Sequence, residues 1–172
     1  AIHRGLADPR TGEFSPDTIH HLIPGRVAVP GSIDVLDVGC GYGSTCIELH
    51  KMLAGRWHGI TISRRQARFA MQSATALVLR SALTFARTSF DAPLPRPFNL
   101  MCGIESLIHS PAPSGTIRNL VRSLVPGGQF IIVDDMPVDD VPANFAHDLE
   151  RFKALWAQDL KRTSLPDSKR FR

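Results

Sequence analysis

Cysteine is scarce in this 172-residue sequence, which contains only Cys40, Cys46 and Cys102. Their odd number and their spacing fit neither a set of disulfides nor a thiolate metal site. They indicate reduced thiols, as in a cytoplasmic protein. His20, His21 and His58 lack partners at metal-ligand spacing, so no metal is expected. No apolar run is long enough to cross a bilayer, and no secretory signal peptide is recognisable.

Net charge is almost absent outside the last dozen residues. The formal charge of the chain is +4, and the segment "KRTSLPDSKRFR" (161–172) holds five basic residues and one acidic residue. This tail therefore accounts for the whole net charge. A basic terminal tail is more often a solvated end than a binding arm, so a nucleic-acid partner is not expected.

Internal repeats and low-complexity segments are also absent, and apolar runs alternate with helical patterns instead. The patterns predict strands over 33–38, 57–62, 83–87, 98–103 and 129–135, and helices over 43–54, 64–79, 113–124 and 143–160. This alternation predicts one α/β domain over 1–172, a doubly wound, mostly parallel sheet with helices on both faces. Its ligands should bind at the carboxyl ends of the strands.

Glycine is concentrated in one place. The stretch "IDVLDVGCGYGS" (33–44) carries Gly39, Gly41 and Gly43 directly after the first predicted strand. Glycine adopts positive φ easily and lets a ligand approach the backbone. A tight strand-to-helix turn without a ligand is the alternative, but one glycine suffices for that. Three at alternate positions favour a ligand-binding loop.

A nicotinamide or flavin dinucleotide is the weaker candidate for this loop. The dinucleotide fingerprint is G-x-G-x-x-G, whereas this loop reads G-x-G-x-G. The fingerprint also needs an acidic residue after the next strand, where this sequence has Thr61 and Ser63.

Four ordered segments between residues 33 and 136 resemble a known family. "VLDVGCGYG", "GITISRRQ", "SFDAPLP" and "LVPGGQFIIVDDM" are similar to segments of class I S-adenosylmethionine-dependent methyltransferases. The resemblance is to a subset that includes sterol C-methyltransferases and cyclopropane fatty acid synthases. It implies a Rossmann-like methyltransferase fold and S-adenosylmethionine as cofactor. The implied loop contacts come from Asp37, Gly39, Cys40, Gly41 and Gly43.

The resemblance also implies contacts to the ribose and adenine. In "GITISRRQ", Thr61 and Gln66 take the place of the acidic residue, and Ser63 is expected to cap the following helix. Gln66 is equally well interpreted as a solvent-exposed residue in the first turn of that helix. In "SFDAPLP", the resemblance places Phe90 for stacking on adenine and Asp91 for accepting its amine, while a simple loop cap is the alternative for Asp91.

Glu105 and His109 are the candidate catalytic residues. They follow the fourth strand and lie four residues apart, so they would share a face if the segment were helical. The resemblance implies that this segment faces the transferred methyl and the acceptor, where an acid can stabilise a carbocation or help remove a proton. The alternative is a local pair that orders the loop. Asp134 and Asp135 either face the pocket or bond to the next turn.

The two ends of the sequence depart from the resemblance. No strand pattern follows "QFIIVDD", and residues 1–30 are short for a segment that covers the cofactor-binding core (31–136); a helix and the basic tail fill 137–172. The sequence is therefore read either as part of a longer enzyme or as a cut-down member.

Two functions follow from this sequence. The first is methyl transfer to a small-molecule acceptor, with carbon in an isoprenoid or related natural product favoured and oxygen or nitrogen open. The second is a non-catalytic methyltransferase-fold module acting with a partner. The sequence predicts a cytoplasmic protein without a membrane span and leaves a homo-oligomer open.

Overall fold

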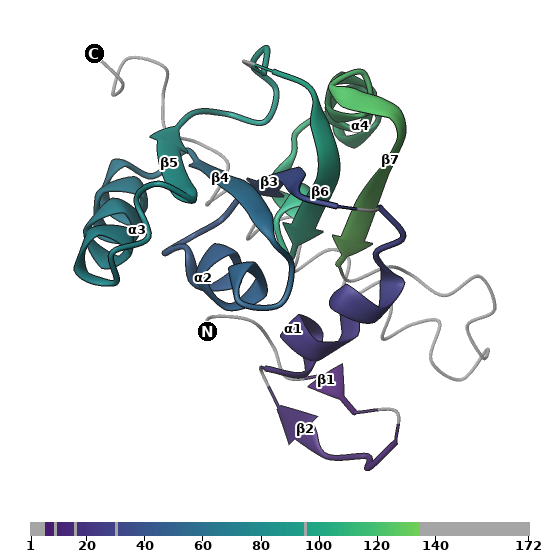
Figure 1. Ribbon diagram of the computed structural model, residues 1–172. Helices are drawn as coiled ribbons and strands as arrows, with labels where there is room; N and C mark the ends of the chain where they lie inside the picture. Colours follow the sequence, from purple (N-terminus) through teal and green to yellow (C-terminus); the bar gives the residue numbers. More distant parts are fainter. Residues whose placement is uncertain (1–5, 9, 16, 30, 95, 135–172) are drawn as a thin grey trace, which may run out of the picture.

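A five-stranded parallel sheet forms the centre of the molecule (Figure 1). The computed structural model describes residues 6–8, 10–15, 17–29, 31–94 and 96–134. The strands lie in the order β5-β4-β3-β6-β7, and every neighbouring pair is parallel. They are β3 (Ile33–Val38), β4 (Gly55–Thr61), β5 (Leu83–Arg87), β6 (Phe98–Ile104) and β7 (Leu124–Val133). The predicted doubly wound α/β sheet is confirmed.

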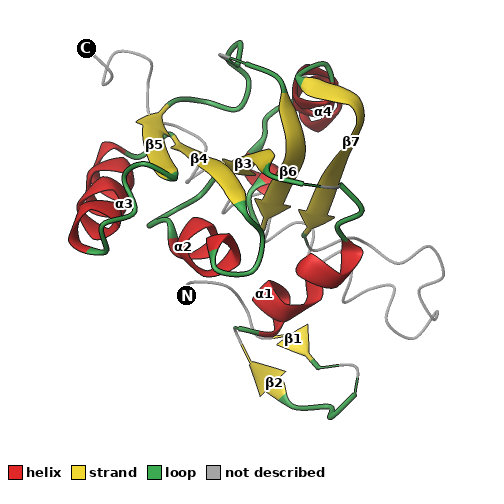
Figure 2. Ribbon diagram, viewed as in Figure 1, coloured by secondary structure: helices red, strands yellow, loops and turns green. Residues whose placement is uncertain are grey.

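Helices cover both faces of this sheet (Figure 2). They are α1 (Thr18–Leu22), α2 (Ser44–His50), α3 (Arg64–Ala76) and α4 (Pro113–Val121), with short 3-10 helices η1 (Pro24–Arg26) and η2 (Leu107–His109). The first three α-helices pack on one face, and α4 packs on the other. A small antiparallel pair, β1 (Leu6–Ala7) and β2 (Phe14–Ser15), precedes them.

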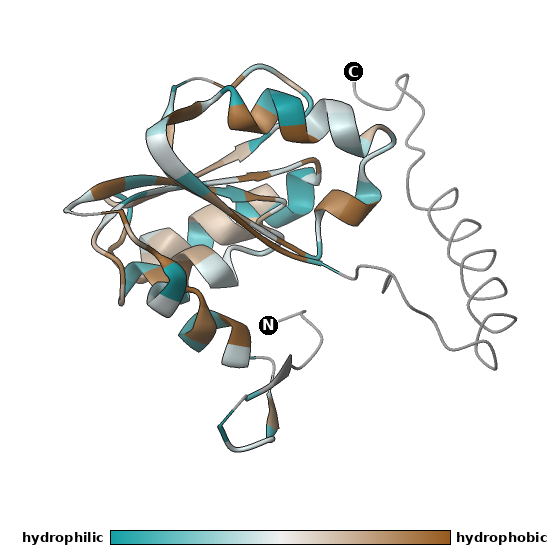
Figure 3. Cartoon of the chain, turned by 90° about the vertical axis from the view of Figure 1, so that its right-hand side faces the viewer, coloured by the Kyte–Doolittle hydropathy of each residue, from teal (hydrophilic) through white to brown (hydrophobic). Residues whose placement is uncertain are grey.

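The side chains of β3 explain why both faces need cover. Successive residues of a strand point to opposite faces. Ile33 and Val35 enter the core under α1–α3, whereas Leu36 and Val38 enter the core under α4. All four are buried, as expected for the central strand of a parallel sheet. Apolar colour runs along the strands in Figure 3.

Three predicted helices are shorter than expected at their carboxyl ends. The helix predicted over 43–54 ends at His50, and that over 113–124 ends at Val121. The helix predicted over 64–79 ends at Ala76 because Val78 takes a left-handed conformation, with φ 58°. The Leu79 N–H then bonds the Ala74 carbonyl at 2.8 Å, which closes a Schellman turn.

The last strand begins earlier than expected. The Pro-Gly-Gly segment, predicted as a connector before a strand over 129–135, lies inside β7 as an irregularity. Phe98 pairs with Leu124, but Leu100 pairs with Gln129, so residues 125–128 bulge out of the ladder. The predicted helix over 143–160 lies outside the described residues.

The strand order reverses between β3 and β6, which is the position where open α/β sheets have their ligand-binding crevice. β3 and β6 are neighbours, yet α2 follows β3 on one face and α4 follows β6 on the other. The helices that follow the two strands therefore lie on opposite faces of the sheet, and such switch points are where open α/β sheets bind ligands. In Figure 1, α1 lies beyond the arrowheads of β6 and β7.

Candidate functional site

The glycine loop follows β3 at this crevice. Gly39, Gly41 and Gly43 all take left-handed backbone conformations, with φ of 78°, 53° and 83°. The Gly43 N–H donates to the Cys40 carbonyl at 2.8 Å, and α2 begins at the next residue. Three left-handed residues within five positions are compatible with glycine and strained for other residues.

The three glycines meet different surroundings. A Cβ on Gly39 would lie 2.5 Å from the Ser106 Cβ, and one on Gly43 would lie 2.8 Å from the Phe85 ring. Packing inside the protein therefore requires both of these glycines. A Cβ on Gly41 would meet nothing within 4 Å. Gly41 is thus the position of the loop that is open to an approaching molecule.

Asp37 lies under the loop and is almost completely buried. Its side chain belongs to the face that α2 covers, and the Cys46 thiol donates to its Oδ2 at 3.3 Å. Burial raises the pKa of Asp37 to about 7, because the charged carboxylate loses water; the bond from Cys46 opposes this rise. Burial and the nearby Asp37 also raise the pKa of the Cys40 and Cys102 thiols. Cys40 points its sulfur into the core, against Gly59.

The residues predicted after the second strand of the core form one hydrogen-bonded group. The Thr61 hydroxyl donates to the Gln66 Oε1 at 2.7 Å, and the Gln66 N–H donates to the Ser63 Oγ at 3.3 Å. Ser63 is therefore the N-cap of α3, as expected from the sequence. Gln66 therefore uses its side-chain oxygen toward Thr61.

Phe90 and Asp91 lie on the side of the sheet that α4 covers. Phe90 packs on the core under α4, and its carbonyl accepts from the Asn119 side chain at 2.9 Å. The Asp91 carboxylate accepts the Thr116 hydroxyl and, at 3.4 Å, the Ser89 hydroxyl. These bonds tie the segment after β5 to α4.

The segment after β6 is not an α-helix. Glu105 has a left-handed φ of 47°, and its N–H donates to the Val133 carbonyl at 2.7 Å. Only the three residues Leu107–His109 are helical, in a 3-10 turn. Glu105 and His109 therefore do not share one face of an α-helix; Glu105 is half-buried at the crevice and His109 is exposed. Asp134 accepts the Ile108 N–H at 3.1 Å, so it bonds to the turn after β6, which is not the turn that follows its own strand. Asp135 lies outside the described residues.

Two functional candidates were not found from the sequence. Ser106 is buried against Gly39. This placement depends on the left-handed backbone conformation of Glu105, and no sequence pattern predicts that conformation. Cys46 was read only as a reduced thiol. Its place in the first turn of the helix after the loop is a usable signal, because that turn returns beside the strand end where Asp37 lies.

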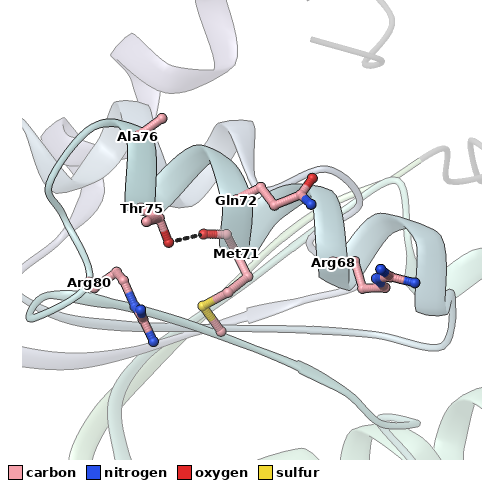
Figure 4. A pocket seen from close by; sticks show the side chains of 6 residues that line it. All are labelled: Arg68, Met71, Gln72, Thr75, Ala76 and Arg80. Carbon is pink, nitrogen blue, oxygen red and sulfur yellow. Dashed lines mark hydrogen bonds between the residues drawn. The ribbon is translucent and has the colours of Figure 1, made fainter.

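Two hollows lie apart from these residues. One, of about 460 Å³, is a groove on α3 and the turn that follows it (Figure 4). Arg68 and Arg80 lie toward its two ends with Met71 between them, and the Thr75 hydroxyl donates to the Met71 carbonyl at 2.8 Å. The other, of about 370 Å³, lies between α1 and α2. Neither is lined by a predicted site residue.

The described residues lack two features. They contain no group of three or more histidine, cysteine or acidic side chains placed to hold a metal ion. Among the helices described, none has the length and apolar character needed to cross a membrane.

The family comparison agrees with the fold and the loop. Residues 31–169 match the model of a family described as "Methyltransferase domain". Since this match covers most of the chain, the chain belongs to this methyltransferase domain family.

Curated relatives include methyltransferases of different acceptors. Tocopherol O-methyltransferase of Arabidopsis thaliana is 30% identical over 148 residues, which are 77% of this chain and 42% of that protein. A sterol 24-C-methyltransferase of Gibberella zeae is 29% identical over 121 residues, which are 69% of this chain and 32% of that protein. The chain thus spans less than half the length of these relatives.

Solved structures share the fold. The cyclase SpnF superposes with a TM-score of 0.71 at 26% identity, over 84% of this chain and 56% of that one. A methyltransferase from Geobacter sulfurreducens, solved with S-adenosyl-L-homocysteine, superposes with a TM-score of 0.63 at 23% identity, over 80% of this chain and 54% of that one.

Proposed function

We propose that this chain binds S-adenosylmethionine across the glycine loop and transfers its methyl group to a small-molecule acceptor. The observation that carries the proposal is the loop itself, with three left-handed glycines at the switch point and open space at Gly41. Membership of the methyltransferase domain family and the bound S-adenosyl-L-homocysteine of a structural neighbour support the same cofactor.

The residues present fit this cofactor. Gly41 lets it approach the backbone of the loop, and the Gln66 Nε2 group, fixed by Thr61, offers donors to its adenosine. Asp37 and Cys40 support the loop from below, Ser63 fixes the start of α3, and Phe90 and Asp91 form the next wall. The bound cofactor supplies a methyl group on a sulfonium leaving group.

Alignment and proton transfer are the tasks left to the protein. Holding the acceptor in line with the methyl group and excluding water accelerates a displacement. Glu105, half-buried at the crevice beside the loop, is placed to accept a proton from the acceptor or to stabilise a developing cation. His109 lies four residues on, at the exposed rim, where it would contact a larger acceptor.

Carbon is the proposed acceptor atom, in an isoprenoid or related natural product. The sterol methyltransferase among the relatives supports it, whereas the tocopherol enzyme keeps oxygen open. One fold supports many different reactions. A structural neighbour of this chain is named as a cyclase. The acceptor must therefore be found by experiment.

Calorimetric titration with S-adenosylhomocysteine tests the cofactor, with NAD as the control ligand. We expect one-to-one binding of S-adenosylhomocysteine in the micromolar range, about −8 kcal/mol, and no heat from NAD. Absence of binding, or preference for NAD, would overturn the proposed function.

Glu105→Gln tests the proposed catalytic role of the Glu105 carboxylate. We expect unchanged affinity for S-adenosylhomocysteine and turnover at least about tenfold lower, because a proton acceptor is lost while the shape is kept. Turnover is measured as transfer of radiolabelled methyl to an acceptor found by screening. Glu13→Gln, the same change at an exposed position, serves as the control. Equal turnover of the two variants contradicts the role of Glu105.

A non-catalytic module acting with a partner is the second candidate. It is favoured by the outer edge of β7, which pairs with no strand among the described residues. Light scattering separates the two: a monomer with turnover eliminates the module, whereas an inactive chain that self-associates or needs a partner supports it.

A further inference from the structure

Ser106 packs against Gly39 near the carboxyl ends of β3 and β6 and is 95% buried, with 5% of its surface exposed. Its Oγ has no hydrogen-bond partner among the described residues. A Cβ on Gly39 would lie 3.2 Å from this Oγ, and one on Gly103 would lie 3.4 Å from it. The hydroxyl therefore lies near the carboxyl ends of both β3 and β6.

The backbone before Ser106 explains this placement. Glu105 takes a left-handed conformation, which costs a residue with a side chain about 1–2 kcal/mol. Its N–H is held by the Val133 carbonyl, so the turn is fixed to β7. The turn directs Ser106 inward toward Gly39. Strain of this kind, held in place by the surrounding structure, is typical of functional sites.

A neighbouring serine shows how unusual the hydroxyl is. Ser110 is also buried, but its Oγ shares a 2.7 Å hydrogen bond with the Thr116 hydroxyl and accepts the Ala112 N–H at 3.2 Å. Buried polar groups are normally paired, and an unpaired one is unfavourable. Within the described chain, Ser106 therefore places a buried hydroxyl at the crevice without an internal bond to stabilise it.

The strand order indicates which part of the cofactor lies nearby. β4 and β6 flank β3 on opposite sides, so Gln66, after β4, and Ser106, after β6, lie on opposite sides of the glycine loop. A cofactor that crosses the loop with its adenosine toward Gln66 brings its amino-acid end toward Ser106. That end carries an ammonium and a carboxylate, and a hydroxyl can accept from one or donate to the other.

We propose that the Ser106 hydroxyl hydrogen-bonds the amino-acid end of S-adenosylmethionine and thereby fixes its position at the β3–β6 crevice. This inference rests on the proposed function and adds a contact made by a residue of this chain.

Calorimetric titration of three proteins with two ligands tests the contact. S-adenosylhomocysteine has the amino-acid end, whereas 5′-methylthioadenosine lacks it. For Ser106→Ala we expect affinity for S-adenosylhomocysteine to fall about tenfold, the loss of one hydrogen bond to a charged group, and affinity for 5′-methylthioadenosine to stay unchanged. Ser110→Ala, the matched buried serine, should change neither affinity.

Thermal unfolding without ligand gives a readout that is independent of binding. Ser106→Ala should raise Tm by about 2 °C, because it removes an unpaired polar group, whereas Ser110→Ala should lower it by about 3 °C. Equal loss of affinity for both ligands, no loss for either, or a lowered Tm of Ser106→Ala each overturns the inference. Failure of the unaltered protein to bind S-adenosylhomocysteine overturns the proposed function instead.

Discussion

Gly39→Ala is expected to destabilise the protein by about 3 kcal/mol. About 1–2 kcal/mol comes from a side chain in the left-handed region, and the remainder from overpacking, because the new Cβ would lie 2.5 Å from the Ser106 Cβ. Urea unfolding followed by circular dichroism measures this loss.

Gly41→Ala is the matched control, since it has the same left-handed requirement without a neighbour within 4 Å. We expect a loss of only about 1 kcal/mol in stability. Its affinity for S-adenosylhomocysteine should nevertheless fall at least about tenfold, because the methyl group occupies the space that the cofactor is proposed to use. The double variant Gly39→Ala with Ser106→Gly should recover the overpacking part of the Gly39→Ala loss. If Gly39→Ala and Gly41→Ala destabilised the protein equally, Ser106 would have to move aside freely, and the expected overpacking at Gly39 would be contradicted.

Asp37→Asn is expected to alter the pH dependence of stability. In the folded protein burial raises the pKa of Asp37 to about 7, against an ordinary value of 3.8. The folded state therefore binds this proton more tightly than the unfolded state does. Below pH 4 the carboxyl has no effect on stability. As the pH rises from 4 toward 7, the carboxyl ionises in the unfolded state but stays protonated in the folded state, so stability falls by roughly 1 kcal/mol per pH unit. Above about pH 7 the carboxyl is ionised in both states, and the curve levels off.

The difference between the two proteins isolates this effect from the other carboxylates. Asparagine has no such proton, so Asp37→Asn should become increasingly more stable than the unaltered protein from pH 5 to pH 7. Urea unfolding at half-unit intervals of pH measures both proteins. Cys46→Ser keeps a donor to Asp37 and should retain the slope. Parallel curves for Asp37→Asn and the unaltered protein would contradict an ionisation of Asp37 near neutrality.

The sequence predicted those features of the fold that depend on local pattern. The strands 33–38 and 83–87 have the predicted bounds because apolar runs ending at glycine or polar loops specify them. Helix ends were predicted less well. Val78 closes α3 in a conformation usually taken by glycine, so the pattern continued to 79 although the helix did not.

For the site, local motifs located the loop and the cap, whereas contacts between distant segments stayed hidden. The Ser63 cap follows from three neighbouring positions and was predicted correctly. The approach of Ser106 to Gly39 joins residues far apart in sequence, and the bond from Thr116 to Asp91 crosses from α4 to another loop. Such pairs depend on how the sheet is assembled. The cofactor and catalytic roles of the site residues remain predictions.

The parallel arrangement of β3 with β6 has a consequence for biosynthesis. The Asp34 N–H donates to the Asn99 side chain, across 65 positions of sequence, whereas β3, β4 and β5 can associate as soon as their residues leave the ribosome. Long-range parallel pairing is slow because a large chain loop must close first. The nascent chain therefore presents an unfinished strand edge until β6 emerges. Closure of that edge and assembly of the β3–β6 switch point are then one event, so a chain that has not completed its sheet cannot form the proposed binding site.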